Sequence, residues 1–182
     1  MQDIDNKLIK KSASGNLDAF EQIYKIASPY IYTIVYQITN NEEDAQDVAQ
    51  EVFIKVYNSL SSFNFKSSFK TWIYKVALNT ALNTVKKRTR DMRKMEEYNK
   101  TAKGSSFHID TDPIHDNDND LNIEKTLKIL NPDQRACILL REVEGLSYKE
   151  IAEALKININ TVRSRLKRAR LALAASYGRR VI

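Results

Sequence analysis

The chain has 182 residues and a mass of 21.0 kDa, enough for one ordinary domain or two small ones. Only 4 Gly and 3 Pro interrupt it, which favours long helices over a turn-rich sandwich or barrel. The single cysteine, Cys137, excludes an intramolecular disulfide framework and a multi-cysteine metal site, and its apolar neighbours predict a buried, reduced thiol.

The net charge of +6 is distributed unevenly along the chain. Residues 66–103 carry 11 Lys/Arg and 3 acids, residues 104–124 carry 6 acids and no Lys/Arg, and residues 159–182 carry 7 Lys/Arg and no acid. Two basic blocks separated by an acidic one indicate two polyanion-binding lobes joined by a tether, although ordinary solubilising charge would give the same pattern. No signal peptide or membrane span is visible, so we expect a cytoplasmic protein without membrane insertion.

Three helices are predicted in the first half of the chain. Apolar residues at steps of three and four run through residues 17–38, with a break or kink expected at Pro29. A second helix starts near residue 42 and carries an acidic face, which suits a basic or mixed-charge protein helix but is equally compatible with plain solvation. That face comprises Asp44, Asp47, Gln50 and Glu51.

The third predicted helix, residues 69–88, has two different stripes. One is apolar and is expected in the core; the other contains Trp72, Lys75, Asn79, Asn83 and Lys86. Cations can contact phosphates, amides can bond base edges and aromatic rings can stack on an unpaired base, so this stripe suits a nucleic acid. The loop aromatics Phe63, Phe65 and Phe69 could wall a pocket for an extruded base, while core packing is the alternative for Trp72 and Phe69.

A flexible acidic linker is predicted after the third helix, over residues 91–121. Asp116, Asp118 and Asp120 have the spacing of a calcium loop, but Leu121 and Leu127 stand where such a loop needs Gly and Glu. His108 and His115 lack a partner pattern for a metal. No metal or other cofactor is therefore expected.

The C-terminal unit, residues 122–182, is predicted to be a helix-turn-helix bundle. Ser147 and Glu150 form a capping box before a short helix, and Asn158 can cap the next one. In that last helix an inward apolar stripe lies opposite a polar face with basic flanks, which suits the DNA major groove but also describes a solvated basic helix. The polar face and flanks comprise Asn160, Thr161, Arg163, Ser164, Arg165, Lys167 and Arg168. Lys156 occupies the turn position usually held by Gly, which predicts strain or a reshaped turn.

Four stretches resemble a bacterial RNA polymerase sigma factor of the small, two-domain extracytoplasmic-function (ECF) group. They are residues 15–24 (GNLDAFEQIY), 44–53 (DAQDVAQEVF), 67–79 (SSFKTWIYKVALN), and the region 4-like segment from residue 130 through 145–152 (GLSYKEIA) to 161–170 (TVRSRLKRAR). The resemblance implies an all-α fold with a region 2 domain over residues 1–90 and a region 4 domain over residues 122–182. It also implies that the protein directs promoter-specific initiation without a catalytic site of its own.

The resemblance implies a role for each of these surfaces. The acidic face would dock on core RNA polymerase. The −10 element would be opened and read by Phe63, Phe65, Phe69, Trp72, Lys75, Asn79, Asn83, Lys86, Lys87 and Arg88. The polar face of the last helix would read the −35 element as duplex DNA. Further implied properties are an anti-sigma factor as a partner and a monomeric free state.

The chain departs from the family pattern in two places. Phe65 and Lys66 stand where the family often has Gly followed by an acid, and Asn83 stands where it often has Asp. Both fall in the −10-reading region, so the promoter preference of relatives does not transfer. A stand-alone helix-turn-helix regulator is the main alternative and would require a dimer and a palindromic site. An enzyme acting on nucleic acid has no supporting acid cluster, His/Cys set or Gly-rich phosphate loop in the sequence.

Overall fold

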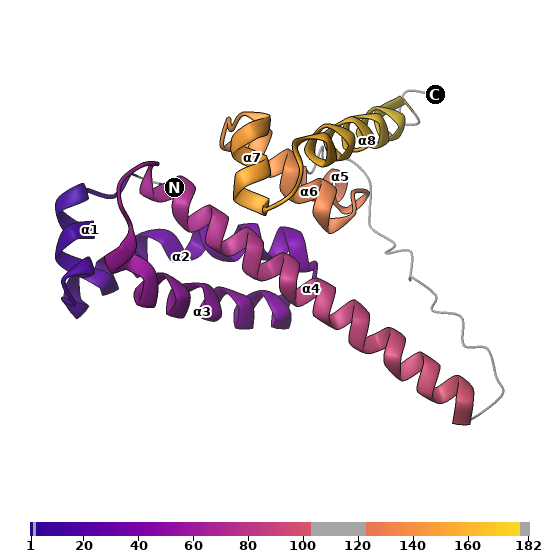
Figure 1. Ribbon diagram of the computed structural model, residues 1–182, viewed down its shortest axis with the longest axis horizontal. Coiled ribbons are helices and arrows are strands. Elements are labelled where there is room, and N and C mark those ends of the chain that lie inside the picture. The colour runs from indigo at the N-terminus through magenta and orange to yellow at the C-terminus, as the bar shows by residue number, and fades with distance from the viewer. Residues whose placement is uncertain (2, 103–122, 179–182) are drawn as a thin grey trace.

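The N-terminal unit of the computed structural model is a bundle of helices (Figure 1). The structure describes residue 1, residues 3–102 and residues 123–178. The unit contains α1 (Asn6–Ala13), α2 (Leu17–Thr39), α3 (Glu42–Ser59), a 3₁₀ turn (Leu60–Ser62) and α4 (Phe69–Ala102). Within the described ranges no residue lies in a strand, which confirms the predicted all-α class.

Asparagines set the boundaries of the first long helices. Asn16 and Asn41 cap α2 and α3, their side-chain oxygens accepting from the backbone N–H of Ala19 at 2.8 Å and of Asp44 at 2.9 Å. Asn40 ends α2 in the left-handed conformation, with φ of 53°. Of the predicted break or kink at Pro29, the break does not occur: α2 continues through it, and Ala27 and Ile31 on either side are fully buried in the core.

The apolar stripes of α2, α3 and α4 face one another and form the core of this unit. Val35 of α2, Val52 of α3 and Ile73 of α4 are all fully buried. The stripe predicted to be the core face of α4 is buried as expected, with Val85 partly covered at its end. The opposite stripe of α4 is therefore turned away from this core.

Helix α4 is longer than the sequence pattern predicts. It continues to Ala102, beyond the other helices of the bundle (Figure 1), with Met92, Met95 and Tyr98 exposed. Its last turns contain neither Gly nor Pro and are rich in Lys, Arg, Met and Glu, which favour helix without needing an apolar face. The linker was predicted to begin at residue 91, whereas α4 continues to Ala102. The rest of the predicted linker contains both histidines and the aspartates with calcium-loop spacing, and it lies outside the described residues.

The C-terminal unit consists of α5 (Ile123–Lys128), α6 (Pro132–Ile138), a π-helical turn (Leu139–Val143), α7 (Tyr148–Leu155) and α8 (Ile159–Gly178). Val162, Leu166 and Ala169 of α8 are buried against α6 and α7, which confirms the predicted inward stripe. Cys137 is fully buried in α6, and burial raises the pKa of its thiol to about 11, so it stays protonated near neutral pH.

The helix-turn-helix forms by the predicted capping. The Ser147 hydroxyl accepts from the Glu150 N–H at 3.3 Å, and the Glu150 carboxylate accepts from the Ser147 N–H at 2.8 Å. Lys156 then closes α7 with φ of 53° and ψ of 46°, the left-handed conformation that glycine adopts without strain. The turn keeps its shape, and the lysine is strained to fit it.

Replacing Lys156 with glycine should stabilise the protein by about 1 kcal/mol, because a residue with a Cβ pays roughly that amount in the left-handed region. Urea denaturation would measure the shift. Lys156→Ala is the matched control, since it removes the charge but keeps the Cβ; equal stabilisation by both variants would show that charge and not backbone strain is responsible.

Candidate nucleic-acid interface

An aromatic cluster lies under the loop between α3 and α4. The ring of Phe63 lies 5.7 Å from that of Phe69 and 5.2 Å from that of Trp72, measured between centroids. Phe63 and Phe69 are buried and Trp72 is half-buried, whereas Phe65 is 40% exposed. Of the predicted base-contacting rings, Phe65 and part of Trp72 therefore reach the surface, and the other two hold the loop from inside.

Phe65 is held in an unusual backbone conformation, with φ of 59°. The family pattern described above predicts glycine here, and the loop holds a left-handed residue despite the bulky side chain. Its ring packs on Phe63 with centroids 4.7 Å apart, and the Lys10 ammonium lies 5.5 Å from its centroid. These two contacts fix the orientation of an exposed aromatic face.

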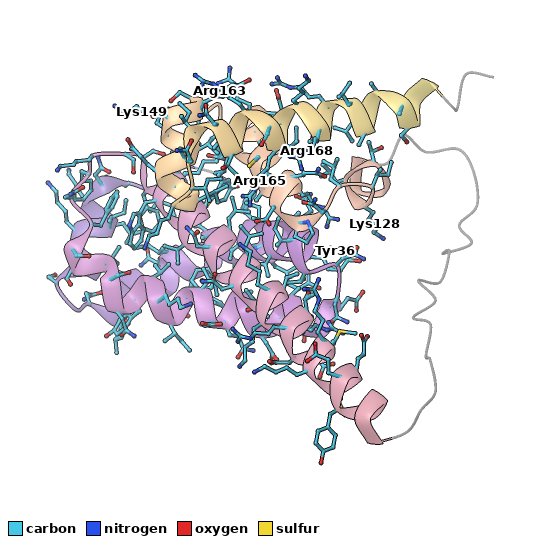
Figure 2. The ribbon with its side chains drawn as sticks, turned by 45° about the vertical axis from the view of Figure 1, so that its right-hand side comes forward. Tyr36, Lys128, Lys149, Arg163, Arg165 and Arg168 are labelled. Atoms are coloured by element: carbon cyan, nitrogen blue, oxygen red, sulfur yellow. The ribbon has the colours of Figure 1, made fainter. Side chains whose placement is uncertain are left out.

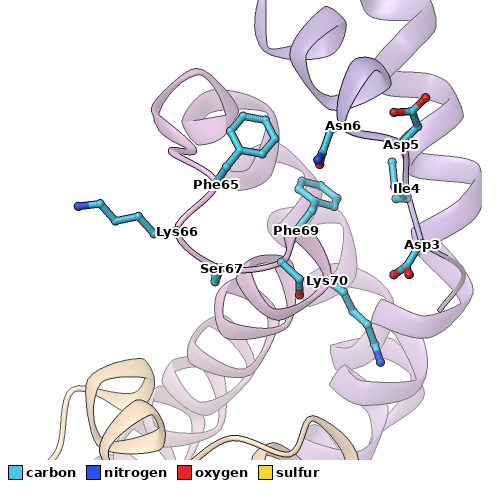
Figure 3. Close-up of a pocket in the computed structure, with 10 residues that line it drawn as sticks. Asp3, Ile4, Asp5, Asn6, Phe65, Lys66, Ser67, Phe69 and Lys70 are labelled. Carbon is cyan, nitrogen blue, oxygen red and sulfur yellow. The ribbon is translucent and has the colours of Figure 1, made fainter.

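A pocket of about 650 Å³ opens beside this loop (Figure 3). Residues 65–70 form one wall, and the N-terminal residues 3–6 form the other. In Figure 3 the Phe69 ring and the Asn6 side chain lie close together, one from each wall. Lys66 points outward from the loop. The Asp5 carboxylate on the N-terminal wall accepts from the Lys7 N–H at 2.9 Å. Sequence reasoning missed the N-terminal wall because the two segments are far apart in the chain.

The polar stripe of α4 divides into an open and a covered part. Asn83, Lys86, Lys87 and Arg88 are exposed. Lys75 and Asn79 are half-buried where α4 meets the C-terminal unit, and the Asn79 amide donates to the carbonyls of Lys75 and Ala154, each at 2.8 Å. Both amide hydrogens of Asn79 are thus in use, one of them across the junction between the two units.

The acidic face of α3 borders the open part of that stripe. Asp47, Gln50 and Glu51 are exposed, and Glu51 pairs with Lys55 at 2.6 Å. Asp44 is less exposed and accepts from the Arg88 guanidinium. A groove of about 360 Å³ between α3 and α4 is lined by acids from α3 and by Asn83 and Lys87 from α4. The predicted polymerase-docking and DNA-binding residues are therefore neighbours.

Four of the seven residues on the predicted polar face and flanks of α8 are exposed. Asn160, Arg163, Lys167 and Arg168 are exposed, and Thr161 and Ser164 are half-buried. Figure 2 shows Arg163 on the outer face, together with Lys149 of α7. Arg165 instead turns inward: its side chain is 21% exposed and lies 3.3 Å from Asp133 of α6. A helical wheel places Arg165 on a flank but cannot reveal the carboxylate that draws it inward.

A buried arginine connects the two units. Arg135 of α6 is 5% exposed and donates to the carbonyl of Gln37 at the end of α2 and to that of Leu130 at 2.8 Å. Burial lowers the pKa of its guanidinium. Lys70 of α4 and Glu144 of the C-terminal unit add an ion pair of 3.3 Å. The sequence analysis did not predict these junction residues. The available signal was Arg135 itself, a charged residue directly before the apolar run 136–140, which indicates burial.

The junction is not fully packed. A mainly apolar cavity of about 550 Å³ lies between the units, lined by Tyr30, Ile34 and Leu78 on one side and by Leu139 and Val143 on the other. A cavity of this size removes packing contacts that a stable domain interface would have. Buried apolar residues of the two units nevertheless form one continuous cluster beside it, and the polar contacts lie around it.

Two classes of feature are absent from the described part of the chain. No group of three or more His, Cys, Asp or Glu side chains there could hold a metal ion. No helix among the described residues is both long and apolar enough to cross a membrane.

Family models and known proteins match both units. The models for sigma-70 region 2 and sigma-70 region 4 match residues 23–91 and 120–173. The chain is 32% identical to the RNA polymerase sigma-H factor of Pseudomonas aeruginosa over 182 residues, covering 94% of this chain and 93% of the relative. It is 33% identical to the ECF RNA polymerase sigma factor SigW of Bacillus subtilis, covering 95% and 96% of the two chains.

Solved structures give the same fold. The sigma factor RpoE of Bartonella quintana, solved with the anti-sigma factor NepR, is 26% identical with a TM-score of 0.60, covering 85% of this chain and 93% of that one. CnrH, solved with the cytosolic domain of CnrY, has a TM-score of 0.61 at 24% identity, covering 96% and 97% of the two chains.

Removing the Arg135 side chain should destabilise the protein by about 2 kcal/mol, because two carbonyls lose a charged donor inside the structure. The measurement is urea denaturation of Arg135→Ala. Arg163→Ala, an exposed arginine of the same unit, is the control and should leave the midpoint unchanged. Equal stability of the two variants would contradict the docked arrangement of the two units.

Proposed function

The chain belongs to the ECF group of sigma-70 RNA polymerase sigma factors, and we propose that α3, α4 and α8 carry its contacts with polymerase and promoter DNA. As a member of this group it is a factor for promoter-specific initiation of transcription. We infer that it acts in the cytoplasm, supplies specificity alone and leaves bond formation to the polymerase.

The observation that carries the proposal is the construction of α4 and α8. Each helix buries an apolar stripe in its own unit and exposes amides and cations on another face, Asn83, Lys86 and Lys87 on α4 and Asn160, Arg163, Lys167 and Arg168 on α8. Cations position a nucleic acid through its phosphates, and amides can bond base edges. Two such helices in two units can read two separate promoter elements.

The −10 element would meet the N-terminal unit. Phe65 and the exposed edge of Trp72 offer stacking surfaces for unpaired bases, and the pocket beside the loop has room for an extruded base. Asn83, Lys86, Lys87 and Arg88 would contact the same strand or its backbone. Phe63 and Phe69 would support the loop from beneath instead of touching DNA.

The −35 element would meet α8 as duplex DNA. Arg163 and Asn160 are linked by a hydrogen bond of 2.8 Å, which orders both side chains on the outward face. Lys167 and Arg168 lie about one turn further along α8 and would contact phosphates. Thr161 and Ser164 lie on the stretch of helix that joins Asn160 to Lys167. Arg165 could join them only after leaving Asp133.

Core polymerase would dock on the acidic face of α3. Asp47, Gln50 and Glu51 are exposed there, and DNA phosphates would repel the two carboxylates. We also infer regulation by an anti-sigma factor, which the structure of the Bartonella quintana relative with NepR supports.

Charge reversal on α3 should weaken holoenzyme formation. Asp47→Lys with Glu51→Lys is expected to reduce affinity for core polymerase at least about tenfold, because each change replaces attraction by repulsion at the interface. Analytical ultracentrifugation or fluorescence anisotropy with purified core enzyme would measure it. Asp18→Lys with Glu21→Lys on α2 alters net charge equally and should bind normally; parallel loss in both pairs would refute α3 as the docking face.

Truncating the phosphate-binding side chains of α8 should flatten the salt dependence of promoter binding. For the holoenzyme, Lys167→Ala with Arg168→Ala is expected to lower the slope of log affinity against log salt by about 2, one for each phosphate that the variant no longer neutralises. Lys25→Ala with Lys128→Ala is the control pair. An unchanged slope in the α8 variant would show that neither residue contacts a phosphate.

A further inference from the structure

The end of α4 carries a row of cations that continues the polar stripe of the same helix. Within that stripe Asn79, Asn83 and Lys86 follow one another at steps of four and three residues. Arg90 and Arg93 extend the row at the same steps, and residues three and four apart share one face of a helix. The stripe therefore does not stop where the bundle stops.

The added cations lie beyond the bundle and are exposed. Arg88 meets Asp44 in the first turn of α3, and after this pair α4 extends past the other helices of the unit (Figure 1). Arg90, Arg93 and Lys94 all lie on this extension with exposed side chains. The Arg90 guanidinium is 3.9 Å from the carboxylate of the next residue in the chain, a pair too long and too exposed to contribute much.

The chemistry of this face suits a polyanion. Residues 86–94 carry six Lys/Arg and one acid. Helical spacing places the exposed methionines Met92 and Met95 on the opposite side of α4, so the cationic face is not part of an apolar patch. Glu97 continues the row one turn beyond Arg93, which ends the cationic stretch at Lys94. Six cations along three turns of helix match the closely spaced phosphates of a nucleic acid.

The position of the extension along α4 indicates which part of the DNA it would meet. Phe65 and Trp72, at the other end of the helix, would meet unpaired bases of the −10 element. A rise of about 1.5 Å per residue places Lys94 about 12 Å beyond Lys86, roughly the length of three to four base pairs. Cations this far along α4 would lie beyond the −10 element, where the two strands remain paired.

We propose that the end of α4 is a further DNA contact, in which Arg90, Arg93 and Lys94 bind phosphates of the spacer, the duplex between the −10 and −35 elements. This inference rests on the proposed function, because it requires the polar stripe of α4 to face promoter DNA. Lysine and arginine on phosphates add affinity and fix position but read no bases. The contact therefore strengthens binding to every promoter of this factor, whatever the sequence of its spacer.

The experiment compares holoenzymes on two fragments of one promoter, defined by start sites mapped with the wild-type holoenzyme. The long fragment contains the spacer as duplex, and the short fragment begins at the upstream edge of the −10 element. On the long fragment, Arg93→Ala with Lys94→Ala should lower the slope of log affinity against log salt by about 2 and weaken binding about tenfold. On the short fragment the variant and the wild type should bind equally. Alanine preserves the helix, so the comparison tests the charges.

Two controls accompany the alanine variant. Arg93→Lys with Lys94→Arg keeps both charges, and Lys25→Ala with Lys128→Ala removes two exposed cations elsewhere; both should bind the long fragment like wild type. An unchanged slope on the long fragment would overturn the α4 contact.

Two other results would also overturn it: equal losses on both fragments, or weakened binding to core polymerase without DNA, because each assigns these cations to a different partner. If the wild-type holoenzyme starts at no defined promoter, the proposed function and the α4 contact fail together. Normal promoter use with an unchanged slope rejects the α4 contact alone.

Discussion

The arrangement of this protein depends on a buried arginine. Arg135 joins the end of α2 to the start of α6 by donating to one carbonyl from each unit. A buried guanidinium is costly unless its donors find acceptors, and the carbonyl of Gln37 is available to it only while the units are docked. The docked arrangement in turn determines which polar residues of α4 and α8 remain free for a nucleic acid.

Docking uses the same chemistry as promoter binding. Lys86 meets Asp133 across the junction, whereas Arg165 meets the same aspartate within the C-terminal unit and Arg88 meets Asp44 within the N-terminal unit. Such pairs are individually weak in water, so they can be exchanged for phosphates without a large barrier in free energy. Of these three cations, Lys86 is therefore the one whose partner depends on the docking of the two units.

The sequence predicted the elements that depend on local chemistry. The capping residues predicted the start of α7, and the apolar residues at helical spacing predicted the buried stripe of α8. Each of these signals is formed by residues only three or four positions apart in the chain. The last turns of α4 were missed since they are mostly charged and leave Met92, Met95 and Tyr98 exposed, so no buried apolar stripe marks them. A break or kink was predicted at Pro29 because packing on either side of it is not visible in the sequence.

The site was predictable by residue type more than by orientation. Spacing marked Phe63, Phe65 and Phe69 as one cluster, but only the fold shows that Phe65 is the exposed ring. Likewise Arg165 lies inward because Asp133, 32 positions earlier in the chain, is brought beside it. The N-terminal wall of the pocket and the Arg135 junction share this origin: they arise from segments that meet only after folding.

The most direct test of this account is transcription with purified core polymerase, the full-length chain and genomic DNA, followed by mapping of all start sites. The account predicts starts at a fixed distance downstream of one shared pair of −10 and −35 sequences, appearing only when the chain and core are both present. Starts identical to those of core enzyme alone, or tight sequence-specific binding by the chain without polymerase, would contradict it.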